Sequence, residues 1–143
     1  MDENNNNNRE YYSNLKANCE NQLELNYGQI IKIENDLDSV SSAVTKMENA
    51  VQNLVSINSD AYNKFGAVCY WHGLKYTETS DIITYDMQTE YGHYLEAIGS
   101  IKNSLIAKKS ELEKQLEKLK QDNSNIYNMI GIYAYKIRTM SEE

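Results

Sequence analysis

The sequence predicts an all-α fold, in the form of one long antiparallel helical hairpin that is coiled-coil-like. Three observations support this prediction. The 143 residues contain no proline and only six glycines, so little interrupts a helix. Apolar residues recur in alternating steps of four and three through both halves of the chain, which is the heptad pattern of packed helices. A central segment, "FGAVCYWHGLKY", breaks this pattern and holds the only tryptophan and the only phenylalanine.

The N-terminal residues 1–8 are predicted to be a disordered tail, because an asparagine-rich tract cannot bury apolar surface. A single helical-hairpin domain then covers residues 9–143. Its first helix is expected over about residues 9–65, where one stripe of residues at heptad spacing forms a seam for packing. The predicted seam consists of Tyr12, Lys16, Cys19, Leu23, Asn26, Ile30, Ile33, Leu37, Val40, Val44, Met47, Val51, Leu54, Asn58, Ala61 and Phe65.

The second helix is expected over about residues 75–139, with a similar seam. Its predicted members are Met87, Tyr91, Tyr94, Ile98, Ile101, Leu105, Leu112, Leu116, Leu119, Ile126, Ile130, Tyr133 and Ile137. The apparent change of register between Leu105 and Leu112 is interpreted as a local stutter. Weak helix formers at 120–125 leave open a kink at that point.

The turn between the helices is expected at about residues 66–74. A short connection makes sequential helices antiparallel neighbours. Trp71 lies where the chain reverses, so its ring can cover the end of the seam. Gly66 and Gly73 supply backbone freedom on either side of it. The alternative interpretation is an ordinary packed turn with no further role.

Charge and hydropathy exclude several classes of function. The formal net charge of −7 disfavours a nucleic-acid partner and an anionic membrane surface, since both require basic residues. The sequence contains no run of 18 apolar residues, so it does not predict a helix that inserts into a membrane. The first residues, "MDENNNNNRE", lack the basic and apolar regions of a Sec signal peptide, so a cytoplasmic location is expected.

The sequence offers little for catalysis, and we expect no enzymatic activity, no cofactor and no metal. Cys69 and His72 are three residues apart, but no third orienting group accompanies them. His93 and His72 do not have the spacing of metal ligands. A continuous first helix would separate Cys19 and Cys69 by about 60 to 70 Å, which predicts two free thiols.

Apolar residues beside the two seams indicate a partner, because a two-helix hairpin leaves its flanks exposed to water. The predicted partner-binding residues are Leu25, Ile31, Val55, Ile82, Ile83, Leu95, Ile106, Tyr127, Ile132 and Tyr135. A homodimer, or bending of the helices over these residues, is the alternative. Asn26 and Asn58 fall on the seam itself, where a polar residue costs stability but fixes register or partner choice.

The central sequence Trp71-His72-Gly73 is a Trp-x-Gly motif between two long amphipathic helices in a small acidic chain. This arrangement resembles the Trp-x-Gly (WXG-like) family of helical hairpins handled by the type VII (Esx) secretion system of Gram-positive bacteria. In length and helix extent the chain is most similar to the YwqH-like relatives, which are encoded beside LXG-domain toxins. The resemblance implies an accessory or targeting protein that binds the helical N-terminal LXG domain of a toxin. Such a chaperone-like protein would aid export, with Trp71 and Gly73 as its motif and a second small helical protein as a further partner.

The sequence departs from this family in one respect. Exported members carry Tyr-x-x-x-Asp/Glu after the second helix of one partner, whereas here Tyr133 is followed by Ile137 and Tyr135 by Thr139 at that distance. Either a partner supplies this signal, so that the two are exported together, or the chain is not itself an export signal. The alternatives to the accessory role are a self-associating structural coiled coil and a secreted Trp-x-Gly substrate. An immunity protein is disfavoured because no compact surface shaped to an active site is predicted.

Overall fold

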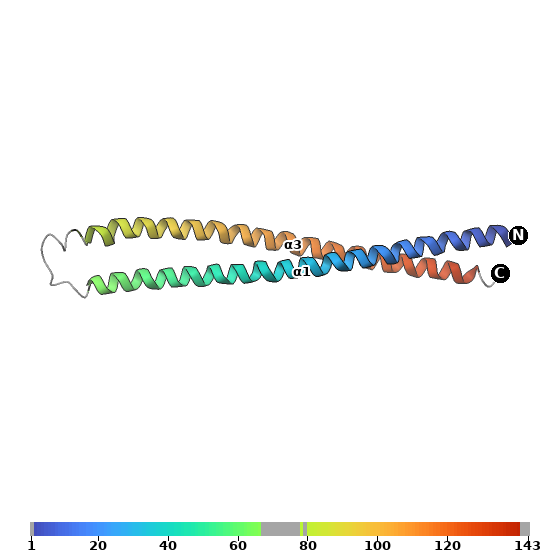
Figure 1. Cartoon of the computed structure of the whole chain (residues 1–143), viewed down its shortest axis with the longest axis horizontal. Helices are drawn as coiled ribbons and strands as arrows, with labels where there is room; N and C mark the ends of the chain where they lie inside the picture. The colour runs from blue at the N-terminus through green and yellow to red at the C-terminus, as the bar shows by residue number, and fades with distance from the viewer. Residues whose placement is uncertain (1, 67–77, 79, 141–143) are drawn as a thin grey trace. The chain divides into compact units, whose positions relative to one another are not determined.

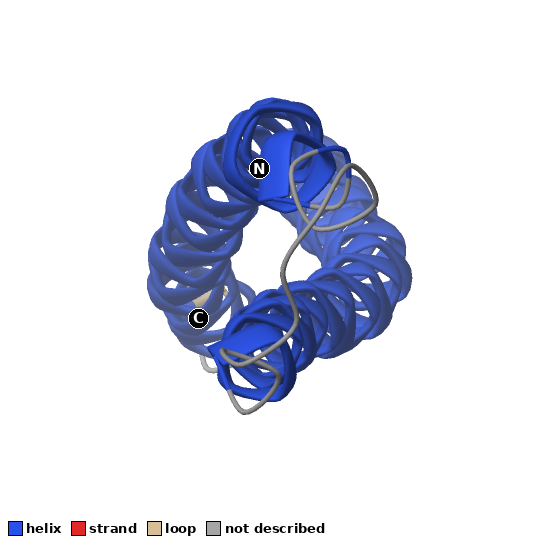
Figure 2. Cartoon of the chain, turned by 90° about the vertical axis from the view of Figure 1, so that its left-hand side faces the viewer, coloured by secondary structure: helices blue, strands red, loops and turns tan. Residues whose placement is uncertain are grey.

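Two long α-helices pack against each other and form almost all of the described chain. The computed structural model describes residues 2–66, 78 and 80–140. Helix α1 spans Asp2–Gly66, a π-helical segment η1 spans Ile82–Asp86, and α3 spans Met87–Thr139 (Figure 1). No strand occurs in these residues (Figure 2). The predicted all-α helical hairpin is therefore confirmed.

The first helix begins earlier than the sequence predicts. α1 starts at Asp2, so residues 2–8 are helical where a disordered tail was expected up to residue 8. Asparagine is a weak helix former, but it costs only about 0.7 kcal/mol per residue relative to alanine. The tract contains no proline or glycine and continues directly into a strongly periodic segment. Helix propagation into the tract therefore meets no steric barrier.

The predicted turn lies mostly outside the described residues. α1 ends at Gly66, where the turn was expected to begin. Trp71 and Gly73, the two motif residues, fall outside the described part of the chain, and so do Cys69 and His72. The prediction that Cys19 and Cys69 lie far apart is therefore not tested here.

The second helix is preceded by a π-helical segment. In η1 the backbone N–H of Met87 donates to the carbonyl oxygen of Ile82, which is the wider hydrogen-bonding step of a π-helix. α3 then runs without interruption to Thr139, including residues 120–125, where the sequence had left a kink open.

The contacts of the chain divide it into two units. Unit 1 consists of Met1–Asp38 and Ser110–Glu143, and unit 2 of Ser39–Lys109. Each unit contains a segment of α1 and a segment of α3. Each segment packs along one stripe only, so apolar side chains are buried shallowly. Leu23, Ile30 and Leu112 are the only apolar side chains buried among the described residues, and all three belong to unit 1.

The two segments of unit 1 are antiparallel. Residues with higher numbers on α1 contact residues with lower numbers on α3. Lys136 Nζ donates to Tyr12 Oη at 3.1 Å, Asn26 Nδ2 to Asn123 Oδ1 at 2.8 Å, and Lys120 Nζ lies 3.6 Å from Glu34 Oε1. The Tyr12 ring also packs 6.0 Å from that of Tyr133, centroid to centroid.

Unit 2 has the same antiparallel arrangement. Lys102 Nζ lies 3.1 Å from Glu48 Oε1, and Gln88 Nε2 donates to Asn58 Oδ1 at 2.9 Å. The residue number of the contact on α3 thus decreases from Lys102 to Gln88, while that on α1 increases from Glu48 to Asn58. Side-chain hydrogen bonds and the ion pair of Lys102 with Glu48 mark the contact in this unit, whose described apolar residues are at most half-buried.

The seam predicted for the first helix is confirmed. Every predicted seam position from Tyr12 to Ala61 is buried or half-buried, and Leu15, Ser41, Ala43 and Ala50 are the only other α1 residues with described burial that are not exposed. The side chain of Phe65 lies outside those described. Seam prediction succeeded here because polar residues at seam spacing, such as Lys16 and Asn26, were retained in the pattern.

The seam predicted for the second helix requires a correction. Half-buried and buried residues follow one unbroken heptad pattern, so there is no stutter between Leu105 and Leu112. Met87, Tyr94 and Ile101 are exposed instead of lying on the seam. The observed seam residues are Gln88, Tyr91, Leu95, Ile98, Lys102, Leu105, Lys109, Leu112, Leu116, Leu119, Asn123, Ile126, Ile130, Tyr133 and Ile137.

The reason for this error is the chemistry of lysine. Lys102 and Lys109 fill seam positions in unit 2, and both are half-buried. A lysine can bury its aliphatic stem while its ammonium reaches the edge of the interface. The ammonium of Lys102 does so by pairing with Glu48. Counting only apolar residues passed over Lys102 and Lys109. The predicted seam shares Tyr91, Ile98 and Leu105 with the observed one, but its alternate positions lie one residue too early.

Candidate functional site

Eight of the ten predicted partner-binding residues are exposed. They are 45% to 63% accessible, a large fraction for apolar residues. These residues are Leu25, Ile31, Val55, Ile82, Ile106, Tyr127, Ile132 and Tyr135. Leu95, which was expected beside the seam, is half-buried on it. The side chain of Ile83 lies outside those described.

The eight exposed residues do not form one patch. Leu25, Ile31, Tyr127, Ile132 and Tyr135 belong to unit 1, and the other three belong to unit 2. The heptad spacing places the unit 1 residues on several outward faces of their helices. Only Tyr127 has a described partner across the helix pair, which is Tyr27. The sequence therefore found exposed apolar residues correctly but did not reveal how they group.

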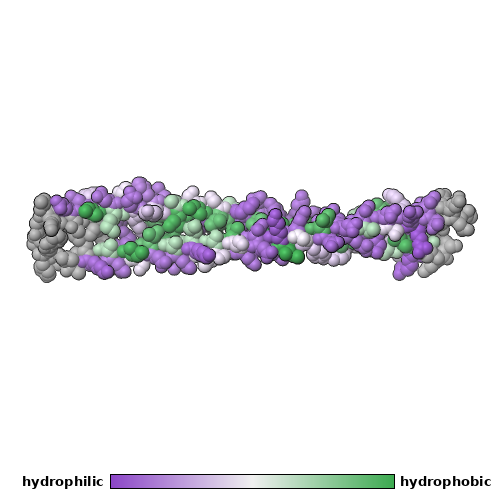
Figure 3. All heavy atoms as spheres, viewed as in Figure 1, coloured by the Kyte–Doolittle hydropathy of each residue, from purple (hydrophilic) through white to green (hydrophobic). Residues whose placement is uncertain are grey.

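An apolar surface of unit 2 lies along one side of its seam. Ile57 on α1 and Met87, Tyr94 and Ile101 on α3 are exposed there. Ala43 and Ala50 precede Ile57 at seven-residue intervals and are half-buried. We call these six residues the apolar flank. Figure 3 shows hydrophobic atoms along the two helices in this part of the chain, on a face that is elsewhere mostly hydrophilic.

A groove of about 210 Å³ lies within the apolar flank. Its lining joins Ile57 on α1 to Met87 and Tyr94 on α3, which shows that the two helices contribute to one surface. The remaining lining residues are Leu54, Asn58, Glu90 and Tyr91. Glu90 is the only charged group among them. Such a groove can hold an apolar side chain of another protein, but it offers almost no polar groups for a small hydrophilic ligand.

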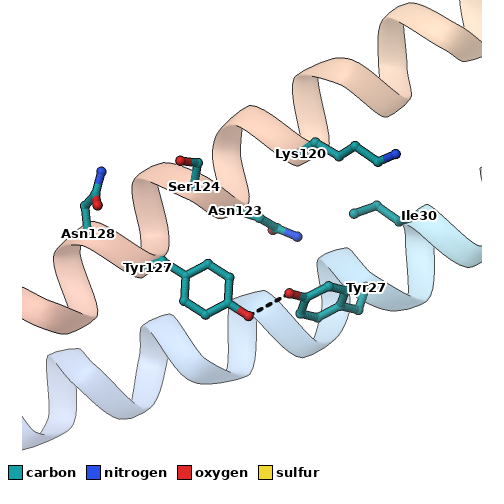
Figure 4. A pocket seen from close by; sticks show the side chains of 7 residues that line it. All are labelled: Tyr27, Ile30, Lys120, Asn123, Ser124, Tyr127 and Asn128. Atoms are coloured by element: carbon teal, nitrogen blue, oxygen red, sulfur yellow. Dashed lines mark hydrogen bonds between the residues drawn. The ribbon is translucent and has the colours of Figure 1, made fainter.

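A second groove, of about 390 Å³, lies in unit 1 and is more polar. The hydroxyls of Tyr27 and Tyr127 share a hydrogen bond of 2.6 Å at its centre, and their rings point toward each other from α1 and α3 (Figure 4). This hydrogen bond is the main reason that the pKa of Tyr27 is raised, and desolvation and the charge of Tyr127 act in the same direction. The other lining residues are Ile30, Lys120, Asn123, Ser124 and Asn128.

Hydrogen-bonded amides lie on the seam of each unit. In unit 1, Asn26 donates to Asn123 and accepts from Gln22 Nε2 at 2.9 Å. In unit 2, Asn58 and Gln88 are paired. Among the residues with described side chains, no buried nitrogen or oxygen lacks a partner. The two asparagines that the sequence placed on the seam are therefore matched by amides on the opposite helix, which favours one register over its neighbours.

Possible metal ligands do not gather among the described residues. Within 2–66, 78 and 80–140, no group of three or more histidine, cysteine, aspartate or glutamate side chains is placed to hold a metal ion. Cys19 is a half-buried free thiol, and His93 is exposed on α3. The groups that meet across the helix pairs are amides, phenols, single ion pairs and apolar side chains. This arrangement provides contact surface and register.

None of the helices in the described ranges combines the length and the hydropathy needed to cross a membrane. Comparisons with protein-family models, with curated proteins and with solved structures find no match for this chain. The Trp-x-Gly resemblance therefore has the sequence around Trp71 as its only support. The structure adds the fold, the groove in the apolar flank of unit 2 and the groove at Tyr27 and Tyr127 in unit 1.

Proposed function

We propose that this protein is a non-catalytic binding module that packs its helix pairs against the helices of a partner protein. One observation carries the proposal. Sixteen large apolar side chains of the described residues are exposed, whereas only three apolar side chains are buried. Apolar surface in such excess is typical of a protein that completes its core by association.

The expected partner is helical because of where the exposed residues lie. Fourteen of the sixteen lie on α1 or α3, beside or behind a heptad seam, and the other two, Ile82 and Tyr85, lie on η1. Such positions on a helix are those that an additional helix covers in a bundle. The described residues include no strand edge to which a peptide could add. The net charge of −7 argues against nucleic acid. An amphipathic helix with a 3.5-residue apolar repeat fits these requirements best.

The Trp-x-Gly resemblance gives this partner an identity that can be tested. We propose the helical N-terminal LXG domain of a type VII-secreted toxin, which the protein would keep soluble and help to export as an accessory or targeting factor. Trp71 and Gly73 would be read by the secretion machinery, and a second small helical protein would complete the complex. Most of the negative charge belongs to unit 1, with 14 acidic and 8 basic residues, which would favour solubility of the free protein.

Co-expression with the helical N-terminal domain of an LXG toxin tests the proposal. Size-exclusion chromatography with light scattering should show a complex of defined stoichiometry. Replacing Tyr135 or Ile106 by glutamate should weaken that complex at least tenfold, because each substitution puts a charge into apolar contact area. Asn103→Glu is the matched control, since Asn103 is an exposed polar residue on the same helix. Absence of a complex with the unsubstituted protein would reject this partner.

The motif needs a separate measurement. Trp71→Ala should reduce the amount of toxin exported and leave the affinity of the protein for the toxin nearly unchanged. The opposite result, loss of binding with normal export of prebound toxin, would show that Trp71 acts in assembly.

A further inference from the structure

The groove of unit 1 brings two phenols into direct contact from opposite helices. Tyr27 on α1 and Tyr127 on α3 are 100 residues apart in the chain, and their hydroxyl oxygens are 2.6 Å apart. The two rings point toward each other across the helix pair (Figure 4). This distance is at the short end for a hydrogen bond between two hydroxyl groups. The rings therefore meet at the ends that carry their oxygens.

Buried neighbours hold the two phenols in this position. Asn26, which precedes Tyr27 in the chain, donates to Asn123 at 2.8 Å, and both amides are buried. Asn123 lies one helical turn before Tyr127, so the amide pair and the phenol pair are neighbouring contacts of the same register. Ile30 is buried one turn after Asn26 and lines the same groove. The packed seam thus fixes which two tyrosines meet.

Both phenols are accessible to a water-soluble oxidant. Tyr27 is 45% exposed and Tyr127 is 51% exposed, so a proton released from either hydroxyl can pass to water. The charged residue that lines the groove is Lys120, whose ammonium lies 3.6 Å from the carboxylate of Glu34. This carboxylate offsets a positive charge that would otherwise oppose the loss of an electron from a phenol.

Another tyrosine pair across the helices of unit 1 is placed less favourably for oxidation. The ring centroids of Tyr12 and Tyr133 are 6.0 Å apart, and both residues are half-buried. The ammonium of Lys136 donates to the Tyr12 hydroxyl at 3.1 Å and lies 4.6 Å from the centre of the Tyr12 ring. A positive charge so close to the ring opposes the loss of an electron from it. We therefore expect Tyr27 and Tyr127 to be oxidised in preference to this pair.

We propose that Tyr27 and Tyr127 are a site of oxidative modification, at which a dityrosine bond joins α1 to α3. The oxidant is hydrogen peroxide acting through a haem peroxidase. Each phenol gives one electron to the peroxidase and its O–H proton to water. The two phenoxyl radicals join through ring carbons next to those that carry oxygen, and the hydrogens on these carbons leave as protons while the oxygens are protonated again. One C–C bond replaces two C–H bonds, and the two electrons and two protons lost overall convert one hydrogen peroxide to two waters.

The contact between the phenols favours coupling within one chain. Groups held at reacting distance can behave as if each were present at about 10⁵ M or more, so they react before radicals on separate molecules meet. The new bond would close a loop between residues 100 positions apart, which reduces the entropy of the unfolded chain. This inference uses only contacts within unit 1 and stands independently of the proposed function.

Oxidation of the full chain by a haem peroxidase and hydrogen peroxide tests the site. The protein should gain dityrosine fluorescence and still run as a monomer on a denaturing gel. Peptide mass spectrometry should find the Tyr27 and Tyr127 peptides joined, with the loss of two hydrogen atoms. Tyr127→Phe and Tyr27→Phe should each lower the fluorescence about tenfold or more, because the remaining phenol loses its oriented partner.

Tyr135→Phe is the matched control on the same helix. Tyr135 is 60% exposed, and its ring centre lies 5.6 Å from the guanidinium carbon of Arg138. Its loss removes an exposed phenol and should leave the fluorescence nearly unchanged. In urea titration the cross-linked chain should have an unfolding equilibrium constant about a thousandfold lower than the untreated chain, from the closed loop. Oxidised Tyr127→Phe should show no such change.

Three outcomes would overturn the proposal. The first is a peroxidase that converts free tyrosine to dityrosine in the same solution but forms no cross-link in this chain. The second is a cross-link that maps to Tyr12 and Tyr133, or one that only joins separate chains. The third is fluorescence that Tyr127→Phe and Tyr135→Phe lower equally. Circular dichroism of these variants should show unchanged helix content.

Discussion

Asn26 and Asn123 are 97 residues apart in the chain, and their buried amides are joined by a hydrogen bond of 2.8 Å across the seam of unit 1. Both side chains are 5% exposed. Neighbouring seam residues such as Leu23 and Ile126 are apolar, so a shift of register would place each amide against hydrocarbon. The pair therefore specifies which residues meet, at some cost in stability relative to two leucines.

Replacing only one of these asparagines should destabilise the protein. Asn123→Leu leaves the Asn26 amide without its acceptor and is expected to cost about 1 to 3 kcal/mol of unfolding free energy. The double variant Asn26→Leu/Asn123→Leu should recover at least the original stability, because no buried amide is then left unpaired and the exposed Gln22 amide can bond to water. Urea unfolding followed by circular dichroism measures both values. Asn103→Leu on the exposed surface is the control. An unchanged midpoint for Asn123→Leu would show that the hydrogen bond contributes nothing.

The tyrosine pair predicts a pH effect. Because the hydroxyl of Tyr127 raises the pKa of Tyr27 above its ordinary value of 10.0, Tyr127→Phe should lower the pKa of Tyr27 toward that value. In the unsubstituted protein the folded pKa exceeds the unfolded one. The stabilising effect of the pair is therefore complete below about pH 10 and is lost as the pH rises through the folded pKa. Carbon-13 NMR of labelled tyrosines follows this titration. Tyr135→Phe should leave the Tyr27 curve in place, and a curve unaffected by Tyr127→Phe would contradict the assigned cause.

Glycines in the helices predict a gain in stability. A Cβ atom added at Gly28 or Gly131 would meet no atom within 4 Å. Each change to alanine should therefore stabilise the protein by about 0.5 to 1 kcal/mol, since glycine carries a larger entropic cost in a helix. Thermal unfolding reports the change. Gly92 and Gly99 have equally open surroundings. If their alanine variants are more stable but bind a helical partner more weakly, that partner packs against this side of α3.

Replacing Lys102, one of the two lysines on the seam of unit 2, should stabilise the protein even though the change removes an ion pair. Lys102→Leu removes the contact with Glu48, which is half-exposed and is worth less than about 1 kcal/mol. The change also completes the apolar seam, and the expected net effect is a gain of about 1 kcal/mol. Lys118→Leu, at an exposed position of the same helix, should change the free energy of unfolding by less than about 0.5 kcal/mol. A loss of stability in Lys102→Leu would show that the ion pair dominates.

Much of the candidate site could be predicted from the sequence because exposure follows from helical position. Leu25, Ile31 and Tyr135 were placed off the seam by spacing alone, and all are exposed. The apolar flank could not be recognised in the same way. Met87, Tyr94 and Ile101 repeat every seven residues, as seam residues do, and the lysines that occupy the true seam do not look apolar in a sequence.

The sequence by itself determined the fold class, the extent of most of both helices and the seam of α1, because local helix propensity and a heptad repeat are properties of nearby residues. Only the tertiary structure decided which of two adjacent stripes on α3 faces α1. That choice depends on pairs across the seam such as Asn58 with Gln88 and Asn26 with Asn123. These contacts join residues 30 and 97 positions apart, and no local pattern encodes a hydrogen bond between them.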